Sequence, residues 1–94
     1  MFDPRTAARE YGIAIELADL GSWGEATLVS EYDPDGPAIR INTRAIPAGS
    51  SCEVREHIDR AVAHELYHHA EAIGAIARLA DGKARERAAG EYRP

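Results

Sequence analysis

One stretch with helical periodicity, residues 51–73, constrains the fold of this chain more than any other segment. Its apolar residues recur every four or seven positions, which aligns them along one stripe of an α-helix. The stripe consists of Ile58, Val62, Leu66 and Ile73. Ser50 and Glu53 form a capping box at the start of the stretch, and Gly74 is typical of a helix end. The sequence therefore predicts one long helix with a buried side.

The chain before this helix has the shorter repeat that is typical of β-strands. Asp3 followed by Pro4 predicts the start of an N-terminal helix, which ends at Gly12. Alternating apolar and polar residues then predict three strands separated by turn-forming residues. The strands are expected over residues 13–17, 25–32 and 39–41.

The chain after the long helix predicts one more helix. Asp81 and Gly82 break the chain, and residues 83–93 have the pattern of a closing helix. No linker or repeat divides the chain. The expected fold is therefore a single α+β domain over residues 1–94. It contains an N-terminal helix, a small three-stranded antiparallel sheet, the long helix and a C-terminal helix.

Charge and composition exclude several classes of function. The formal net charge is −5, which disfavours sequence-independent binding to nucleic-acid phosphates. Charged residues interrupt every apolar run well before the ~18 residues that a membrane helix needs. Cys52 is the single cysteine, so no internal disulfide can form, and residues 1–5 lack the start of a secretory signal. The sequence predicts a cytoplasmic protein that binds neither nucleic acid nor membrane, and it leaves the oligomeric state open.

The segment His64-Glu65-Leu66-Tyr67-His68 is an H-E-x-x-H motif inside the predicted long helix. Residues four apart lie one helical turn apart, so both imidazoles can reach one zinc ion at ~2.0–2.1 Å. Glu65 lies ~100° around the helix axis, where it can act on a water molecule held by the metal. The motif predicts that His64 and His68 bind Zn²⁺ and that Glu65 is the general base.

A catalytic zinc ion needs at least one more protein ligand. No histidine follows His69 in the chain. Glu71 lies on the same helix face as His64, but a straight helix spreads His64, His68 and Glu71 over roughly 10 Å of its axis. The third ligand is therefore expected from another element.

The closing helix offers two candidates for the third ligand. If the long helix ends at Gly74, the chain can turn back and bring Glu86 beside the histidines. If the helix continues to Ala80, Glu91 lies nearer. The spacing favours Glu86. The remaining alternatives are Asp19, Asp81 or a residue of a partner chain.

Two segments, Ile39–Asn42 and Ala61–His68, resemble the ImmA/IrrE-type zinc metallopeptidases and the related minigluzincins. In this family an N-terminal helix and a small sheet precede the active-site helix, which implies a minimal zincin-like fold. The closing segment Glu86–Tyr92 is similar to the third-ligand helix of the family, usually Glu-x-x-Ala-Asn-x-Phe, and this implies Glu86 as the ligand. The chain departs from the family at Tyr67, where glycine is usual, and at Gly90, where asparagine is usual.

Several other side chains lie close to the motif in sequence or in the expected fold. His57 is expected to be solvated or packed, with contact to substrate as the alternative. His69 is expected to make a structural hydrogen bond. The alternative is that it stabilises an oxyanion or forms a hydrogen bond to a metal ligand. Packing is the first expectation for Tyr67 and Tyr92, and stabilisation of a tetrahedral intermediate is the second. Trp23 is expected to cover one edge of the sheet.

These observations predict a zinc-dependent metalloendopeptidase. Its substrate would be a protein or peptide that lies extended along a sheet edge and forms backbone hydrogen bonds there. The family resemblance implies a regulatory protein, such as a repressor, as the target. The alternative is a metal-binding interaction module without proteolysis, in a stress- or phage-related regulator. The presence of Glu65 favours the enzyme, because a structural zinc site needs no general base.

Overall fold

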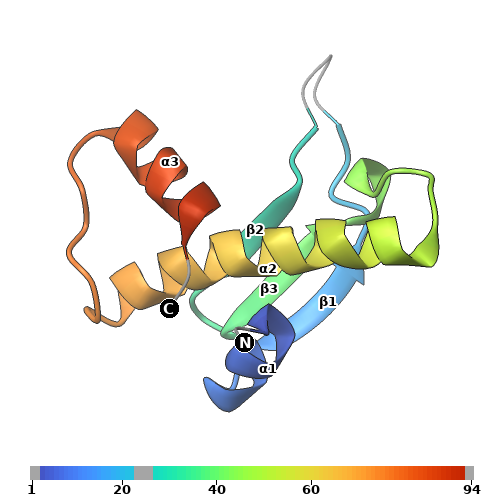
Figure 1. Cartoon of the computed structure of the whole chain (residues 1–94). Helices are drawn as coiled ribbons and strands as arrows, with labels where there is room; N and C mark the ends of the chain where they lie inside the picture. Colours follow the sequence, from blue (N-terminus) through green and yellow to red (C-terminus); the bar gives the residue numbers. More distant parts are fainter. Residues whose placement is uncertain (1–2, 23–26, 93–94) are drawn as a thin grey trace.

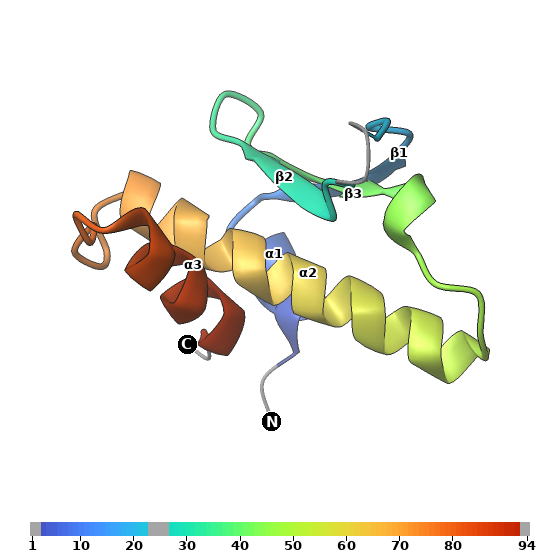
Figure 2. The same cartoon turned by 90° about the horizontal axis from the view of Figure 1, so that it is seen from above.

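The structure is a computed structural model that describes residues 3–22 and 27–92. The elements follow one another as α1 (Pro4–Glu10), β1 (Ala14–Ala18), β2 (Ser30–Asp33), β3 (Ala38–Asn42), a short 3₁₀ turn (Thr43–Ala45), α2 (Ser51–Ala72) and α3 (Gly82–Glu91). The long helix α2 crosses the molecule, and the sheet and α1 lie against it (Figure 1). Seen from above, the sheet lies on one side of α2 and α3 lies beside the C-terminal half of α2 (Figure 2). The expected α+β class is confirmed.

Local sequence signals account for the limits of the helices. Asp3, Ser50 and Asp81 are the N-caps, and each side chain accepts a hydrogen bond from a backbone N–H in the first turn. Gly12 and Gly74 follow the ends of α1 and α2 with φ angles of +73° and +77°, which residues with a side chain rarely adopt. The three helices therefore begin and end within two residues of the predicted limits.

The sheet is mixed, so the expectation of an antiparallel sheet is wrong. The strand order is β1-β3-β2, with β1 parallel and β2 antiparallel to β3. The antiparallel prediction pairs strands that follow one another in the chain. Four of the five residues of β3 are buried, however, so this strand takes the central position and separates β1 from β2.

The second strand also differs from its prediction. It was expected over residues 25–32, whereas β2 covers Ser30–Asp33. Residues 23–26, including Trp23, lie outside the described residues, so the role expected for Trp23 is not addressed. In the strand order β1-β3-β2, β2 is an edge strand with one side unpaired by the sheet.

The core lies between α2, α1 and the inner face of the sheet. Its buried apolar members are Ala8, Ile13, Ile39, Ile41, Ala61, Val62 and Leu66. Ile58 packs against this cluster, so three of the four residues of the predicted stripe meet the core. The prediction that Ile73 belongs to the buried stripe is wrong, because its side chain is 57% exposed at the C-cap of α2, beyond the core. The described residues contain no helix with the length and apolar character that membrane crossing requires.

Asn42, at the end of β3, is fully buried and satisfies its whole side-chain amide. Its Oδ1 accepts from the backbone N–H groups of Leu20 and Arg44, at 3.0 and 3.1 Å. Its Nδ2 donates to the carbonyl oxygens of Gly21 and Leu28, at 2.9 and 2.7 Å. Three of these bonds hold the two ends of the β1–β2 connection, and the fourth, with Arg44, holds the turn after β3.

Asn42→Ala is expected to lower the free energy of unfolding by roughly 2–4 kcal/mol, since four hydrogen bonds are lost and their backbone partners stay partly buried. Thr43→Ala, at the neighbouring exposed position, is the control and should change stability by less than about 0.5 kcal/mol. Urea denaturation measures both variants. Equal stabilities of the two variants would contradict the role given to Asn42.

Candidate metal centre

Three predicted ligands converge where α3 crosses α2. His64 and His68 project from α2, with ring centroids 5.2 Å apart. Glu86 comes from α3, and its carboxylate lies 3.0 Å from His64 Nε2 and 3.6 Å from His68 Nε2. One potential ligand atom from each residue lies within 4.8 Å of the other two. Among the described residues, this is the one group of three acidic, histidine or cysteine side chains close enough to hold a metal ion.

The donor set fits a zinc ion. Bonds of ~2.0–2.2 Å in tetrahedral geometry separate ligand atoms by roughly 3.4 Å. The Oε2 atom of Glu86 lies 3.0 Å from His64 Nε2, and its Oε1 atom lies 3.6 Å from His68 Nε2. Two imidazoles and one carboxylate are a ligand set of catalytic zinc sites, which leave the fourth position open. The Glu86 side chain is 62% exposed, so this group lies at the protein surface rather than in the core.

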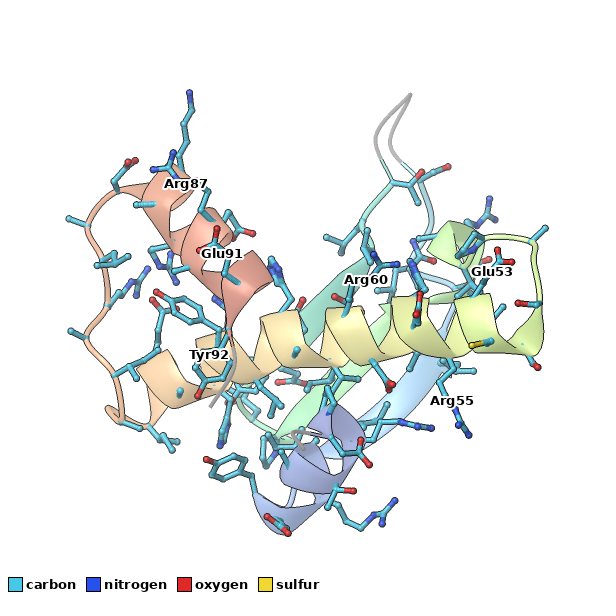
Figure 3. All side chains as sticks on the ribbon, viewed as in Figure 1. Glu53, Arg55, Arg60, Arg87, Glu91 and Tyr92 are labelled. Carbon is cyan, nitrogen blue, oxygen red and sulfur yellow. The ribbon has the colours of Figure 1, made fainter. Side chains whose placement is uncertain are left out.

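The end of α2 explains why Glu86, rather than Glu91, reaches the histidines. The helix ends before Gly74, which is the condition under which the sequence favours Glu86. Glu91 is exposed near the end of α3, and Figure 3 labels it there. Asp19 is paired with Arg44, and Asp81 caps α3. The described residues thus contain an acidic candidate for the third ligand, Glu86, without a partner chain.

Glu65, the predicted general base, is buried beside the two histidines with 5% of its surface exposed. Ser30 Oγ, from the first residue of β2, donates a hydrogen bond of 2.5 Å to Glu65 Oε2. The contact engages one carboxylate oxygen and links the edge strand to the motif helix. Ser30 is not among the predicted site residues, because nothing in the sequence around it marks a serine that contacts a residue 35 positions away.

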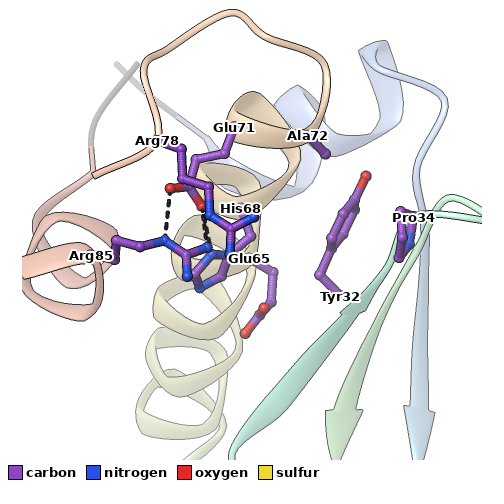
Figure 4. Close-up of a pocket in the computed structure, with 8 residues that line it drawn as sticks. All are labelled: Tyr32, Pro34, Glu65, His68, Glu71, Ala72, Arg78 and Arg85. Atoms are coloured by element: carbon purple, nitrogen blue, oxygen red, sulfur yellow. Dashed lines mark hydrogen bonds and ion pairs between the residues drawn. The ribbon is translucent and has the colours of Figure 1, made fainter. Parts of the chain in front are cut away.

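Glu71 is outside the group of potential ligands, as its distance along the helix axis predicts, but it has contacts that were not predicted. Its carboxylate lies 3.1 Å from His68 Nδ1. It also accepts hydrogen bonds from Arg85 Nε and Nη2, at 3.0 and 2.9 Å (Figure 4). The Arg85 guanidinium is the main cause that lowers the pKa of Glu71 to about 2, and His68 adds to the effect. The carboxylate is therefore ionised at neutral pH, although only 5% of the side chain is exposed.

Comparison with known proteins identifies no relative of this chain. No family model, curated protein or solved structure matches this chain. The resemblance to the ImmA/IrrE-type peptidases therefore rests on the sequence segments alone.

Two hollows meet at Glu65, one on each side of it. The first has a volume of about 400 Å³ and extends toward the C-terminal end of α2 (Figure 4). Its lining residues include Tyr32, Pro34, His68, Arg78 and Arg85. The second has a volume of about 490 Å³, and its lining residues include Leu28, Ser30, His57, His64 and Glu86. Since each hollow is lined in part by β2 or its flanking residues, the open space follows the edge strand past the metal ligands.

The remaining aromatic and histidine side chains mostly have packing roles. His69 Nδ1 lies 2.7 Å from the hydroxyl of Tyr32, which confirms the structural hydrogen bond expected for His69. Burial lowers the pKa of His69 and raises that of Tyr32, so both side chains are neutral at pH 7. Tyr67 is buried, and its ring packs against His68 and Tyr92, as the packing expectation requires. Tyr92 follows α3 and lies over α2 (Figure 3).

Proposed function

We propose that this protein is a zinc-dependent endopeptidase with a minimal zincin-like fold, similar to the ImmA/IrrE-type metallopeptidases and the minigluzincins. One observation carries the proposal. Potential ligand atoms of His64, His68 and Glu86 lie within 4.8 Å of one another, and the buried Glu65 lines the same hollow as His64 and Glu86. Glu86 supplies the one carboxylate of the ligand group, and a site that only held a structural metal would have no need for a second carboxylate at Glu65.

In this proposal the ligands and the base have separate tasks. His64, His68 and Glu86 would hold a zinc ion, which would act as a Lewis acid and lower the pKa of a water molecule toward ~7. Glu65 takes a proton from the attacking water and passes it to the nitrogen of the departing amine. Ser30 holds Glu65 Oε2 by its hydrogen bond, which leaves Oε1 free for the proton transfers.

The proposed substrate is an extended protein or peptide segment that lies along β2. The free side of this edge strand can pair with a substrate backbone, since its other side pairs with β3. The hollows on both sides of Glu65 can each receive side chains, so the substrate can continue past the cleaved bond in both directions. This arrangement supports endopeptidase rather than exopeptidase activity. Cys52 is free and exposed, which supports a reducing compartment such as the cytoplasm.

Removal and return of the metal test the proposal. A chelator is expected to abolish cleavage of an unfolded protein substrate, and one equivalent of Zn²⁺ should restore it. X-ray absorption at the zinc edge should find two imidazoles, one carboxylate and one further oxygen ligand. Four protein ligands, or tight zinc binding without cleavage of any member of a diverse peptide library, would instead support the non-proteolytic regulatory module.

A further inference from the structure

The carboxylate of Glu71 contacts both elements that supply the metal ligands. It lies in the last turn of α2, where it faces His68 on its own helix and Arg85 on α3 (Figure 4). Arg85 immediately precedes Glu86 in the chain. The Glu71 side chain thus contacts His68 directly, and it contacts Arg85, the residue next to Glu86.

The contact with His68 decides which ring nitrogen is available to a metal. The Glu71 carboxylate accepts two hydrogen bonds from Arg85 and lies 3.1 Å from His68 Nδ1, so this nitrogen is the donor and carries the proton. The lone pair is then on Nε2, the nitrogen that faces Glu86. Without an acceptor at Nδ1, the neutral ring can also adopt the other tautomer, in which Nε2 is protonated and cannot bind zinc.

The contact with Arg85 attaches α3 to α2. Arg85 binds the Glu71 carboxylate through two of its nitrogens, in the two-point geometry that holds a guanidinium most firmly. The apolar attachment of α3 comes from Ala89, the one buried residue among its ten, and from Tyr92, which follows the helix and packs on Tyr67 of α2. The ion pair adds a polar attachment at Arg85, next to Glu86, before a metal binds.

We infer that Glu71 is a positioning residue of the metal site, which sets the tautomer of His68 and anchors α3 through Arg85 so that Glu86 is delivered to the metal. The inference rests on the proposed metal site. It predicts that the loss of Glu71 weakens zinc binding more than the loss of Arg85, because Arg85 serves only the anchoring task.

Two variants separate the tasks. Arg85→Gln removes the anchor and leaves the acceptor for His68, whereas Glu71→Leu removes both. Hydrogen exchange of the metal-free proteins should show faster exchange in α3 for both variants. The zinc dissociation constant, measured by chelator competition, should rise for Arg85→Gln and rise roughly 10-fold further for Glu71→Leu. Glu71→Gln keeps an acceptor oxygen and should recover part of that additional loss.

Arg44→Gln is the matched control, because it breaks the exposed pair of Arg44 with Asp19 away from the metal site. It should change neither α3 exchange nor zinc affinity. Equal zinc affinities of Glu71→Leu and Arg85→Gln would overturn the role of Glu71 in orienting His68. Unchanged α3 exchange in both would overturn the anchor. These measurements need no substrate, so zinc binding without proteolysis would refute the proposed activity and leave this inference standing.

Discussion

Glu65→Gln is expected to reduce peptide cleavage about 10³-fold or more while the protein keeps its zinc. Glutamine has the size of glutamate and retains an oxygen that can accept the hydrogen bond of Ser30. It cannot take a proton from water, and general-base catalysis contributes typically ~10²–10⁴ to the rate. Because Glu65 lies outside the ligand group, zinc stoichiometry and affinity should match those of the wild type.

Glu31→Gln is a matched control for this experiment. Glu31 lies next to Ser30 on β2, and its carboxylate forms an ion pair with Arg40. The same Glu→Gln change there should leave cleavage within about twofold of the wild type, because a partly exposed ion pair contributes little. The rates should be measured at saturating zinc. Cleavage that persists in Glu65→Gln would show that another group is the base.

Local signals explain why part of the site could be predicted from the sequence. His64 and His68 are four residues apart, so a single helix fixes their relation whatever the rest of the chain does. The prediction of Glu86 depended on one further local feature, the helix end before Gly74. Caps at Asp3, Ser50 and Asp81 are also local, and for this reason the limits of the helices could be predicted closely.

The features that the sequence did not predict all depend on contacts between distant segments. The position of β3 between β1 and β2 follows from its burial on both faces, which strand periodicity alone does not determine. Ser30 reaches Glu65 only after the sheet has packed on α2. Glu71 could have been noticed, because it follows His68 by three residues, the spacing of side chains that touch on a helix. The contact of Glu71 with Arg85 depends on how α3 packs against α2, which the local sequence does not determine.

Glu86→Ala is expected to weaken zinc binding by roughly 10³-fold, equivalent to about 4 kcal/mol, since one of three protein ligands is lost. Glu91→Ala should leave the zinc dissociation constant within about twofold. Five residues along α3 turn the side chain roughly 140° around the helix axis, so Glu91 cannot face the same ion as Glu86. The two variants remove the same charge from the same helix, and their difference therefore isolates coordination from long-range electrostatics.

Chelator competition measures both constants, and Glu86→Gln extends the comparison. An amide oxygen is a weaker zinc ligand than a carboxylate, so this variant should lie between the wild type and Glu86→Ala. Hydrogen exchange of α3 in the metal-free proteins should change little in any of the three variants, because Arg85 still binds Glu71. Equal and small losses in Glu86→Ala and Glu91→Ala would remove both residues as ligands. The third ligand would then have to come from outside the described residues, and the geometric basis of the proposed activity would fail.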